Sequence, residues 1–180
     1  MSGADAHSAG DPMTRTDAED LIQCLQEAFG DTEPPLSAEL EAANCTIESS
    51  FPDAVRGRSW RDLRPLDSYI PDASDLVLLS AKAYCYYLPA YLYALVGGES
   101  DNVYLNGVLD SLWYEGLYFD SPFQRHLWDE RMLLLTEAQK RCIGHFLVQI
   151  LRRTDDSVLG EGSNRRRIEL MLKKYWNARF

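Results

Sequence analysis

The segment that decides the fold is SAKAYCYYLPAYLYALVGG, residues 80–98. Apart from Lys82 it carries no charge, and its apolar and aromatic residues recur at spacings of three and four, which is typical of a helix face. A second face is also apolar. Ser80 is a good N-cap, and Gly97 with Gly98 favours a helix end. The segment therefore predicts a central helix enclosed by its neighbours. Its aromatic residues are all tyrosines: Tyr84, Tyr86, Tyr87, Tyr91 and Tyr93.

A membrane-spanning helix is the alternative interpretation of this segment. A span needs about 20 predominantly apolar residues, whereas this run is shorter, rich in phenols and interrupted by Pro89. Pro89 removes one backbone hydrogen bond and bends a helix. Such a bend either lets the helix wrap around its neighbours or shapes a tyrosine-lined pocket. We favour a buried helix in a protein without a membrane segment.

Short motifs around this segment occur in a characteristic order. SWRDL (59–63) and Leu79-Ser80 come before YYLPAYL (86–92), while LTEAQ (135–139) and Tyr175-Trp176 follow it. In this order they resemble an uncharacterised family of small bacterial proteins, over roughly residues 60–176. The resemblance implies no established enzymatic activity. Some small bacterial proteins of this general kind are immunity partners of toxins, which makes inhibition of a toxin the implied function.

The length of 180 residues fits one domain. We predict a disordered tail at 1–13 and one helical domain at 14–180, with an acidic part at 14–58 and the family-like core at 59–180. The fold class is mostly α, a compact bundle of about six helices with a long irregular connection at 51–74 before the central helix. Helices are expected to begin near residues 16, 37, 80, 103, 136 and 165.

Two sequence patterns mark helix starts, and two further segments have less regular patterns. Thr16 with Glu19, and Thr136 with Gln139, have the spacing of a capping box, in which each side chain bonds the other residue's amide. Residues 119–131 predict a loop with a short turn of helix. A short helix is also expected at 59–63, where Trp60 and Leu63 would fix the long connection to the core.

The charge is uneven along the chain. The net charge is −10, and residues 1–80 hold sixteen acidic and five basic side chains. Residues 140–180 hold four and ten. Repulsion from phosphates argues against nucleic acid as a partner. The acidity serves either solubility or recognition of a basic protein. The basic run 165–167 is expected to pair within the chain, against the acidic N-terminal half.

The cysteines and histidines do not form a recognisable site. Cys24, Cys45, Cys85 and Cys142 are scattered, which fits reduced thiols in a cytoplasmic protein. There is no secretory signal pattern. Neither a metal-ligand spacing nor a phosphate-binding loop occurs, so we predict no metal, no cofactor and no catalytic residues. A Cys142–His145 nucleophile pair is the alternative to a core cysteine beside a partly buried histidine.

These observations favour a non-catalytic cytoplasmic protein that inhibits a protein partner, most plausibly an immunity protein that occludes the basic active-site cleft of a toxin. Two alternatives stay open: an enzyme or small-molecule binder with a tyrosine-lined pocket near Pro89, and an adaptor subunit of a larger assembly. For the inhibitor, the predicted partner-binding residues are carboxylates in two segments: Asp67, Asp72, Asp75, Glu99 and Asp101.

Overall fold

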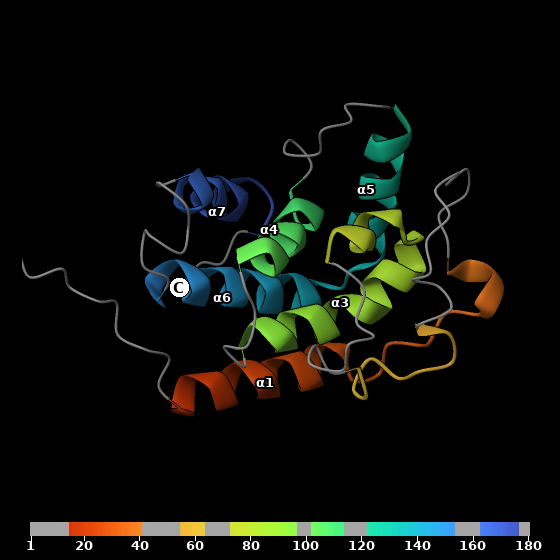
Figure 1. Ribbon diagram of the computed structural model, residues 1–180, viewed down its shortest axis with the longest axis horizontal. Helices are drawn as coiled ribbons and strands as arrows, with labels where there is room; N and C mark the ends of the chain where they lie inside the picture. The colour runs from red at the N-terminus through yellow and green to blue at the C-terminus, as the bar shows by residue number, and fades with distance from the viewer. Residues whose placement is uncertain are drawn as a thin grey trace, which may run out of the picture.

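The computed structural model describes residues 15–40, 55–63, 73–96, 102–113, 122–153 and 163–176. In these residues the chain is mostly helical, which confirms the predicted fold class (Figure 1). The predicted tail at 1–13 lies outside the described residues. The helices are α1 (Arg15–Phe29), η1 (Ser37–Glu39), η2 (Ala73–Leu78), α3 (Ala81–Val96), α4 (Asn102–Ser111), α5 (Pro122–Leu134), α6 (Glu137–Arg153) and α7 (Ser163–Lys174), where η denotes a 3-10 helix.

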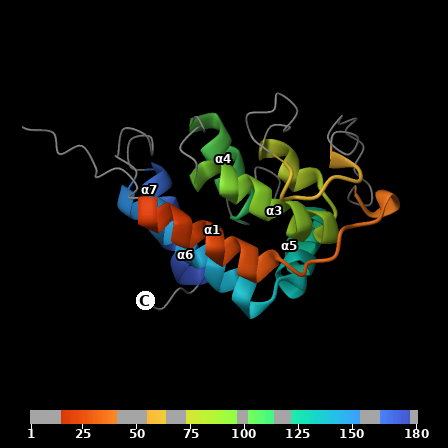
Figure 2. The same ribbon diagram turned by 90° about the horizontal axis from the view of Figure 1, so that it is seen from below.

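Helix α3 lies at the centre of the arrangement. It packs against α1, α4, α5 and η2, while α1 also packs along α6 and α6 packs against α7 (Figures 1 and 2). All residues of α3 except Lys82 and Tyr93 are buried. Ser80 caps the helix as predicted, because its Oγ accepts a hydrogen bond from the Ala83 amide at 3.1 Å. The helix ends at Val96, directly before the two glycines.

The tyrosines of α3 are part of the core. Tyr84 is 1% exposed, and its hydroxyl donates to the Ser111 carbonyl at 3.0 Å. The Tyr87 hydroxyl donates to the Val55 carbonyl at 2.9 Å. Burial raises the pKa of both phenols to about 12. Pro89 lies inside α3 and is buried. These described hydroxyls therefore tie α3 to neighbouring backbone, an arrangement that opposes a tyrosine-lined pocket.

Arg131 is a charged residue that is buried in this core. It is 1% exposed, and its guanidinium donates to three carbonyls at the end of η2: Leu76 at 3.3 Å, Val77 at 3.0 Å and Leu79 at 2.9 Å. It also lies 4.3 Å from the centre of the Tyr84 ring. In the described part of the chain no carboxylate pairs with it, and burial lowers its pKa to about 10. Arg131 thus joins α5, η2 and α3.

Helix α5 corrects a prediction. Residues 119–131 were expected to form a loop with a short turn of helix, but a 13-residue helix begins at Pro122. Its buried residues are Leu127, Trp128 and Arg131, so one buried position carries a charge and the apolar stripe is incomplete. Proline at the first helical position was the available signal, since its fixed φ suits a helix start and no hydrogen bond is lost there.

Other helix boundaries were predicted with mixed success. The capping box of α6 is confirmed: Gln139 Oε1 accepts from the Thr136 amide at 2.9 Å, and Thr136 Oγ1 accepts from the Gln139 amide at 3.2 Å. Helix α1 begins at Arg15, so Thr16 lies in its first turn and is not the predicted N-cap. Residues 59–63 form a turn instead of a helix, but Trp60 and Leu63 are buried as expected.

Candidate functional site

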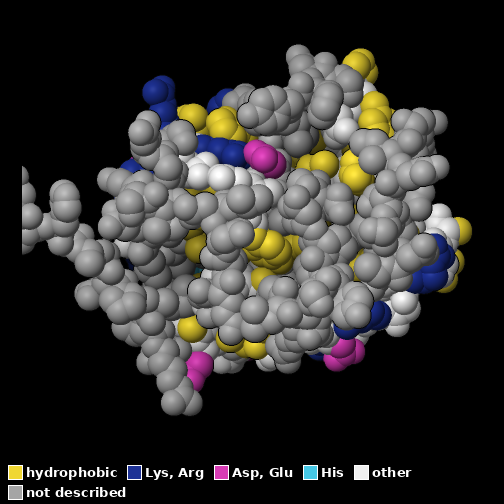
Figure 3. Space-filling model, viewed as in Figure 1, with side chains coloured by type: hydrophobic (Ala, Val, Ile, Leu, Met, Phe, Trp, Pro, Cys, Tyr) yellow, Lys and Arg dark blue, Asp and Glu magenta, His cyan; other side chains and the backbone are white. Residues whose placement is uncertain are grey.

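The structure does not test the predicted partner-binding carboxylates. Asp67, Asp72, Glu99 and Asp101 lie outside the described residues, and for Asp75 only the backbone is described, within η2. On the face shown in Figure 3, the described Asp and Glu side chains are separated from one another and form no continuous patch. A concave site lies elsewhere among the described residues.

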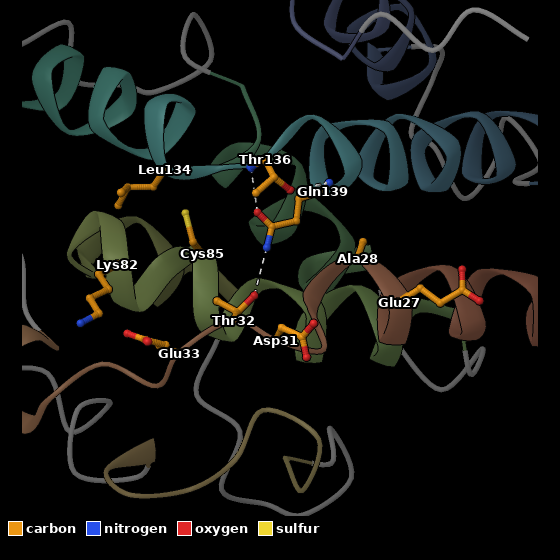
Figure 4. A pocket seen from close by; sticks show the side chains of 10 residues that line it. All are labelled: Glu27, Ala28, Asp31, Thr32, Glu33, Lys82, Cys85, Leu134, Thr136 and Gln139. Atoms are coloured by element: carbon orange, nitrogen blue, oxygen red, sulfur yellow. Dashed lines mark hydrogen bonds between the residues drawn. The ribbon is translucent and has the colours of Figure 1, made fainter.

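One cavity lies where the end of α1, the start of α3 and the α5–α6 junction meet. Its volume is about 300 Å³. We call it the acidic groove (Figure 4). Its lining residues are Glu27, Ala28, Asp31, Thr32, Glu33, Lys82, Cys85, Leu134, Thr136 and Gln139.

Hydrogen-bonded polar side chains form one wall of the acidic groove. Gln139 is 5% exposed, and its amide is held at both ends: Oε1 accepts from the Thr136 amide, and Nε2 donates to Thr32 Oγ1 at 3.0 Å. The capping box of α6 thereby connects to the residue that follows α1 (Figure 4). Because each end of the Gln139 side chain is already bonded, this wall gives the groove its shape.

Among the described lining residues, Cys85 alone carries a sulfur. It is buried in α3, and its Sγ points toward Leu134 and Thr136 (Figure 4). The thiol donates a weak hydrogen bond to the Arg131 carbonyl at 3.7 Å. Burial raises its pKa to about 12. At neutral pH Cys85 is therefore a protonated thiol that fills space and is not an activated nucleophile.

The charged lining residues are mainly acidic. Among the described lining residues, Glu27, Asp31 and Glu33 are exposed carboxylates, and Lys82 is the one cation. Figure 4 shows Glu33 and Lys82 pointing toward one another. Lys82 is itself engaged by Glu39 at 2.9 Å. The hydrogen bond from Lys82, together with one from the Leu36 amide, holds the pKa of Glu39 below its usual range. The groove therefore presents excess negative charge.

Exposed leucines lie at and beside the acidic groove. Leu134, a lining residue, is 53% exposed, and Leu133 before it is 83% exposed. Leu36 is 68% exposed and is linked to the groove through Glu39, which accepts from both the Leu36 amide and Lys82. The adjacent Leu133 and Leu134 therefore place apolar surface in contact with water beside the charged lining.

The structure bears on two further predictions, the Cys142–His145 nucleophile pair and the internal pairing of the basic run 165–167. The interaction with the Cys24 thiol and burial both raise the pKa of Cys142, so Cys142 is not an activated partner of His145. His145 lies 3.2 Å from the Gln149 amide nitrogen. Arg167 of the basic run pairs within the chain as predicted, but its partner is Asp110 of α4 and not an acid of the N-terminal half.

In the described ranges, no three His, Cys, Asp or Glu side chains come together in a way that would hold a metal ion. No described helix is long and apolar enough to cross a bilayer. A second cavity, of about 410 Å³, is bordered by Pro122, Arg125, His126 and Asp129, all from the first turns of α5. Among the described residues, the lining of this second cavity comes from one helix, so it does not bring together side chains from different elements.

A family model described as "Family of unknown function (DUF6714)" matches residues 17–180. The chain belongs to this family. The match includes residues 17–58, which the motif resemblance left out, and it contains every residue of the acidic groove. No curated protein and no solved structure matches the chain significantly.

Sequence reasoning missed the site of this DUF6714 protein. Nothing in the sequence connected the acidic, proline-rich segment 31–35 to α3 or α6. The available signal was local: Glu27, Asp31 and Glu33 surround the end of α1. Carboxylates are unfavourable there because the helix dipole leaves partial negative charge at that end. Carboxylates at this unfavourable end of α1 were therefore the available sign of a site that binds a cationic group.

Proposed function

We propose that this DUF6714 protein is a non-catalytic binding protein whose acidic groove receives a lysine or arginine side chain from a basic protein partner, and that this binding inhibits the partner. The observation that carries the proposal is the groove itself. Three carboxylates surround a cavity of about 300 Å³ whose thiol is protonated and whose wall is rigid.

The size and chemistry of the groove favour one side chain over a larger ligand. Small-molecule sites range from about 300 to 1,000 Å³, so this cavity is at the lower end. A cationic side chain has a long apolar stem, which Leu134 and Ala28 can contact, and a charged tip for the carboxylates. Arginine is the better fit for several carboxylates, since its planar guanidinium carries five donors.

Electrostatics at this exposed site act mainly on the rate and specificity of association. Opposite charges 4 Å apart in water gain about 1 kcal/mol, so three such contacts alone make only a weak complex. The exposed Leu133 and Leu134 supply apolar area beside the charges, and buried apolar anchors provide most interface affinity. Complementary charge steers the encounter with a basic cleft.

Inhibition in this proposal is steric. A partner whose basic cleft binds a phosphate-containing substrate loses access to it when its own lysine or arginine is held in the groove. A cytoplasmic immunity protein that neutralises a bacterial toxin is the finer form of the proposal, with Asp67, Asp72, Asp75, Glu99 and Asp101 as its further predicted partner contacts.

The first test is recovery of a partner from the native cell with three tagged forms of the chain. These are the wild type, the groove variant Asp31→Asn/Glu33→Gln, and the control Asp20→Asn/Glu169→Gln. The control removes the same charge from exposed positions on α1 and α7. We expect one stoichiometric basic protein, released by salt, bound by the wild type and the control and reduced at least tenfold with the groove variant.

The second test uses a defined probe in place of the partner. N-acetyl-leucyl-arginine amide is titrated into labelled protein, with the neutral citrulline analogue as control. Amide shifts at Thr32, Lys82 and Gln139 with the arginine probe alone support the groove. Equal shifts with both probes, or a partner that the groove variant retains fully, overturn the proposal. A partner that salt does not release favours an adaptor that uses the exposed leucines.

A further inference from the structure

A lysine of the chain itself places its ammonium at the edge of the acidic groove. Lys82 extends from the first turn of α3, and its Nζ lies 2.9 Å from Glu39 Oε2 of η1. Figure 4 shows Glu33 directed toward the same ammonium. The Lys82 side chain is 40% exposed and that of Glu39 is 37% exposed, so the pair is open to solvent. The groove therefore already holds a cation of the kind that it is proposed to bind.

The position of Glu39 does not depend on Lys82. Its Oε2 also accepts a hydrogen bond from the Leu36 amide at 2.7 Å, within η1. Its backbone carbonyl accepts from Ser80 Oγ, and the Ser80 amide donates to the Leu40 carbonyl at 3.1 Å. These contacts hold η1 against the start of α3. The carboxylate would therefore keep its place if the Lys82 ammonium moved away.

The ammonium of Lys82 can be displaced at low cost. An exposed ion pair contributes little to stability, because both charged groups are hydrated again when they separate. The flexible four-carbon stem of lysine lets the ammonium move while the backbone of α3 stays in place. An arginine guanidinium can donate two parallel hydrogen bonds to one carboxylate, whereas an ammonium acts as a point charge. An incoming arginine therefore competes well for Glu39.

We propose that Lys82 is a built-in competitor for the acidic groove: its ammonium occupies the Glu39 carboxylate in the free protein, and an arginine of the partner displaces it. This role rests on the proposed function and adds Glu39 to the groups that contact the partner. The displaced ammonium remains close to Glu33, which lies on its other side (Figure 4). Binding therefore exchanges one cation for another at a carboxylate that stays in place.

The competitor determines which partners bind. A lone basic side chain must break the Lys82–Glu39 pair to form another pair of the same kind, so its net gain is small. A partner that also covers the exposed Leu133 and Leu134 buries apolar area that Lys82 does not oppose. Lys82 therefore discriminates against basic proteins that offer no apolar contact beside their arginine.

The experiment titrates N-acetyl-leucyl-arginine amide into the labelled full-length protein and derives its dissociation constant from the amide shifts. We expect Lys82→Met to bind this probe about fivefold more tightly than the wild type, which is the scale of one exposed ion pair. Lys82→Arg keeps a cation on Glu39 and should show no such gain. Lys140→Met is the matched control, because it removes a lysine from an ion pair with Glu137, at 3.1 Å, outside the groove lining. Its dissociation constant should change by less than about twofold.

A second pair of variants separates displacement from general repulsion. Glu39→Gln removes the charge but keeps an acceptor for the Leu36 amide, so the shape of η1 is retained. In this background the further change Lys82→Met should gain less than about twofold, because no carboxylate is released. General repulsion between Lys82 and the probe would instead give the same gain in both backgrounds.

Three results overturn the competitor role and leave the proposed function standing. The wild type binds the probe and Lys82→Met binds it no more tightly; Lys140→Met gains as much as Lys82→Met; or the full gain from Lys82→Met persists in the Glu39→Gln background. If no form binds the probe, Lys82→Met included, the proposed function itself is overturned and the competitor role falls with it. Binding by Lys82→Met but not by the wild type supports the competitor role.

Discussion

Two faces of the first turns of α3 have different surroundings. Tyr84 and Tyr87 point into a sealed core where their hydroxyls bond backbone carbonyls. Lys82 and Cys85, on neighbouring positions, face the acidic groove. The Tyr84 and Tyr87 hydroxyls are each bonded to a backbone carbonyl, so their role is structural. In the groove three carboxylates face solvent, so their charge is available to a partner. The comparison separates residues that build the fold from residues that can bind.

The largest effect is expected in the core, from Arg131→Met. Methionine fills much of the same space but leaves the carbonyls of η2 without their donor, and a buried unsatisfied group costs about 1–3 kcal/mol. Relief of the buried charge offsets part of this loss. We expect about 3 kcal/mol of destabilisation in urea unfolding. An unchanged midpoint would show that Arg131 does not hold η2 in place.

An intermediate effect is expected where core and groove meet, from Thr136→Ala. The Thr136 hydroxyl accepts a hydrogen bond from the Gln139 amide, and loss of an N-cap lowers the free energy of unfolding by about 1 kcal/mol. Thr136→Ser keeps the hydroxyl and should lose less than half of that. Thermal melts followed by circular dichroism measure both variants. If serine and alanine are equally destabilising, the lost contact is the methyl group and not the cap.

The smallest effect is expected at the rim of the groove, from Lys82→Met. The Lys82–Glu39 pair is exposed, so we expect the thermal midpoint at neutral pH to fall by less than about 2 °C. The pKa of Glu39 is lowered in the folded state, so the contribution of the pair is present above the ordinary glutamate pKa of about 4.3 and is lost as pH falls through the lowered value.

The wild type and Lys82→Met should therefore differ at pH 6 and converge as pH falls through the lowered pKa of Glu39. Melting curves over a pH series on the acid side measure the difference. A gap of constant size across the whole series would mean that the aliphatic stem of Lys82, and not its charge, stabilises the rim. Together the three variants rank the regions by how much of the fold depends on them.

What was predictable from sequence was local. The Ser80 cap, the capping box of Thr136 and Gln139, and the burial of α3 each follow from residues within one or two turns of one another. Helix α5 was missed because one of its buried positions is Arg131, whose charge interrupts the apolar pattern. The acidic groove was missed because its carboxylates are indistinguishable in sequence from other exposed acids.

The sequence by itself determined that this protein is helical, that residues 81–96 form its central helix, and where several helices begin, because periodicity and caps act over a few residues. Only the tertiary structure decided that Arg131 lies at the end of η2, that Gln139 reaches Thr32, and that α1 packs along α6. These contacts join residues that are far apart in the chain, and their geometry depends on how the helices pack.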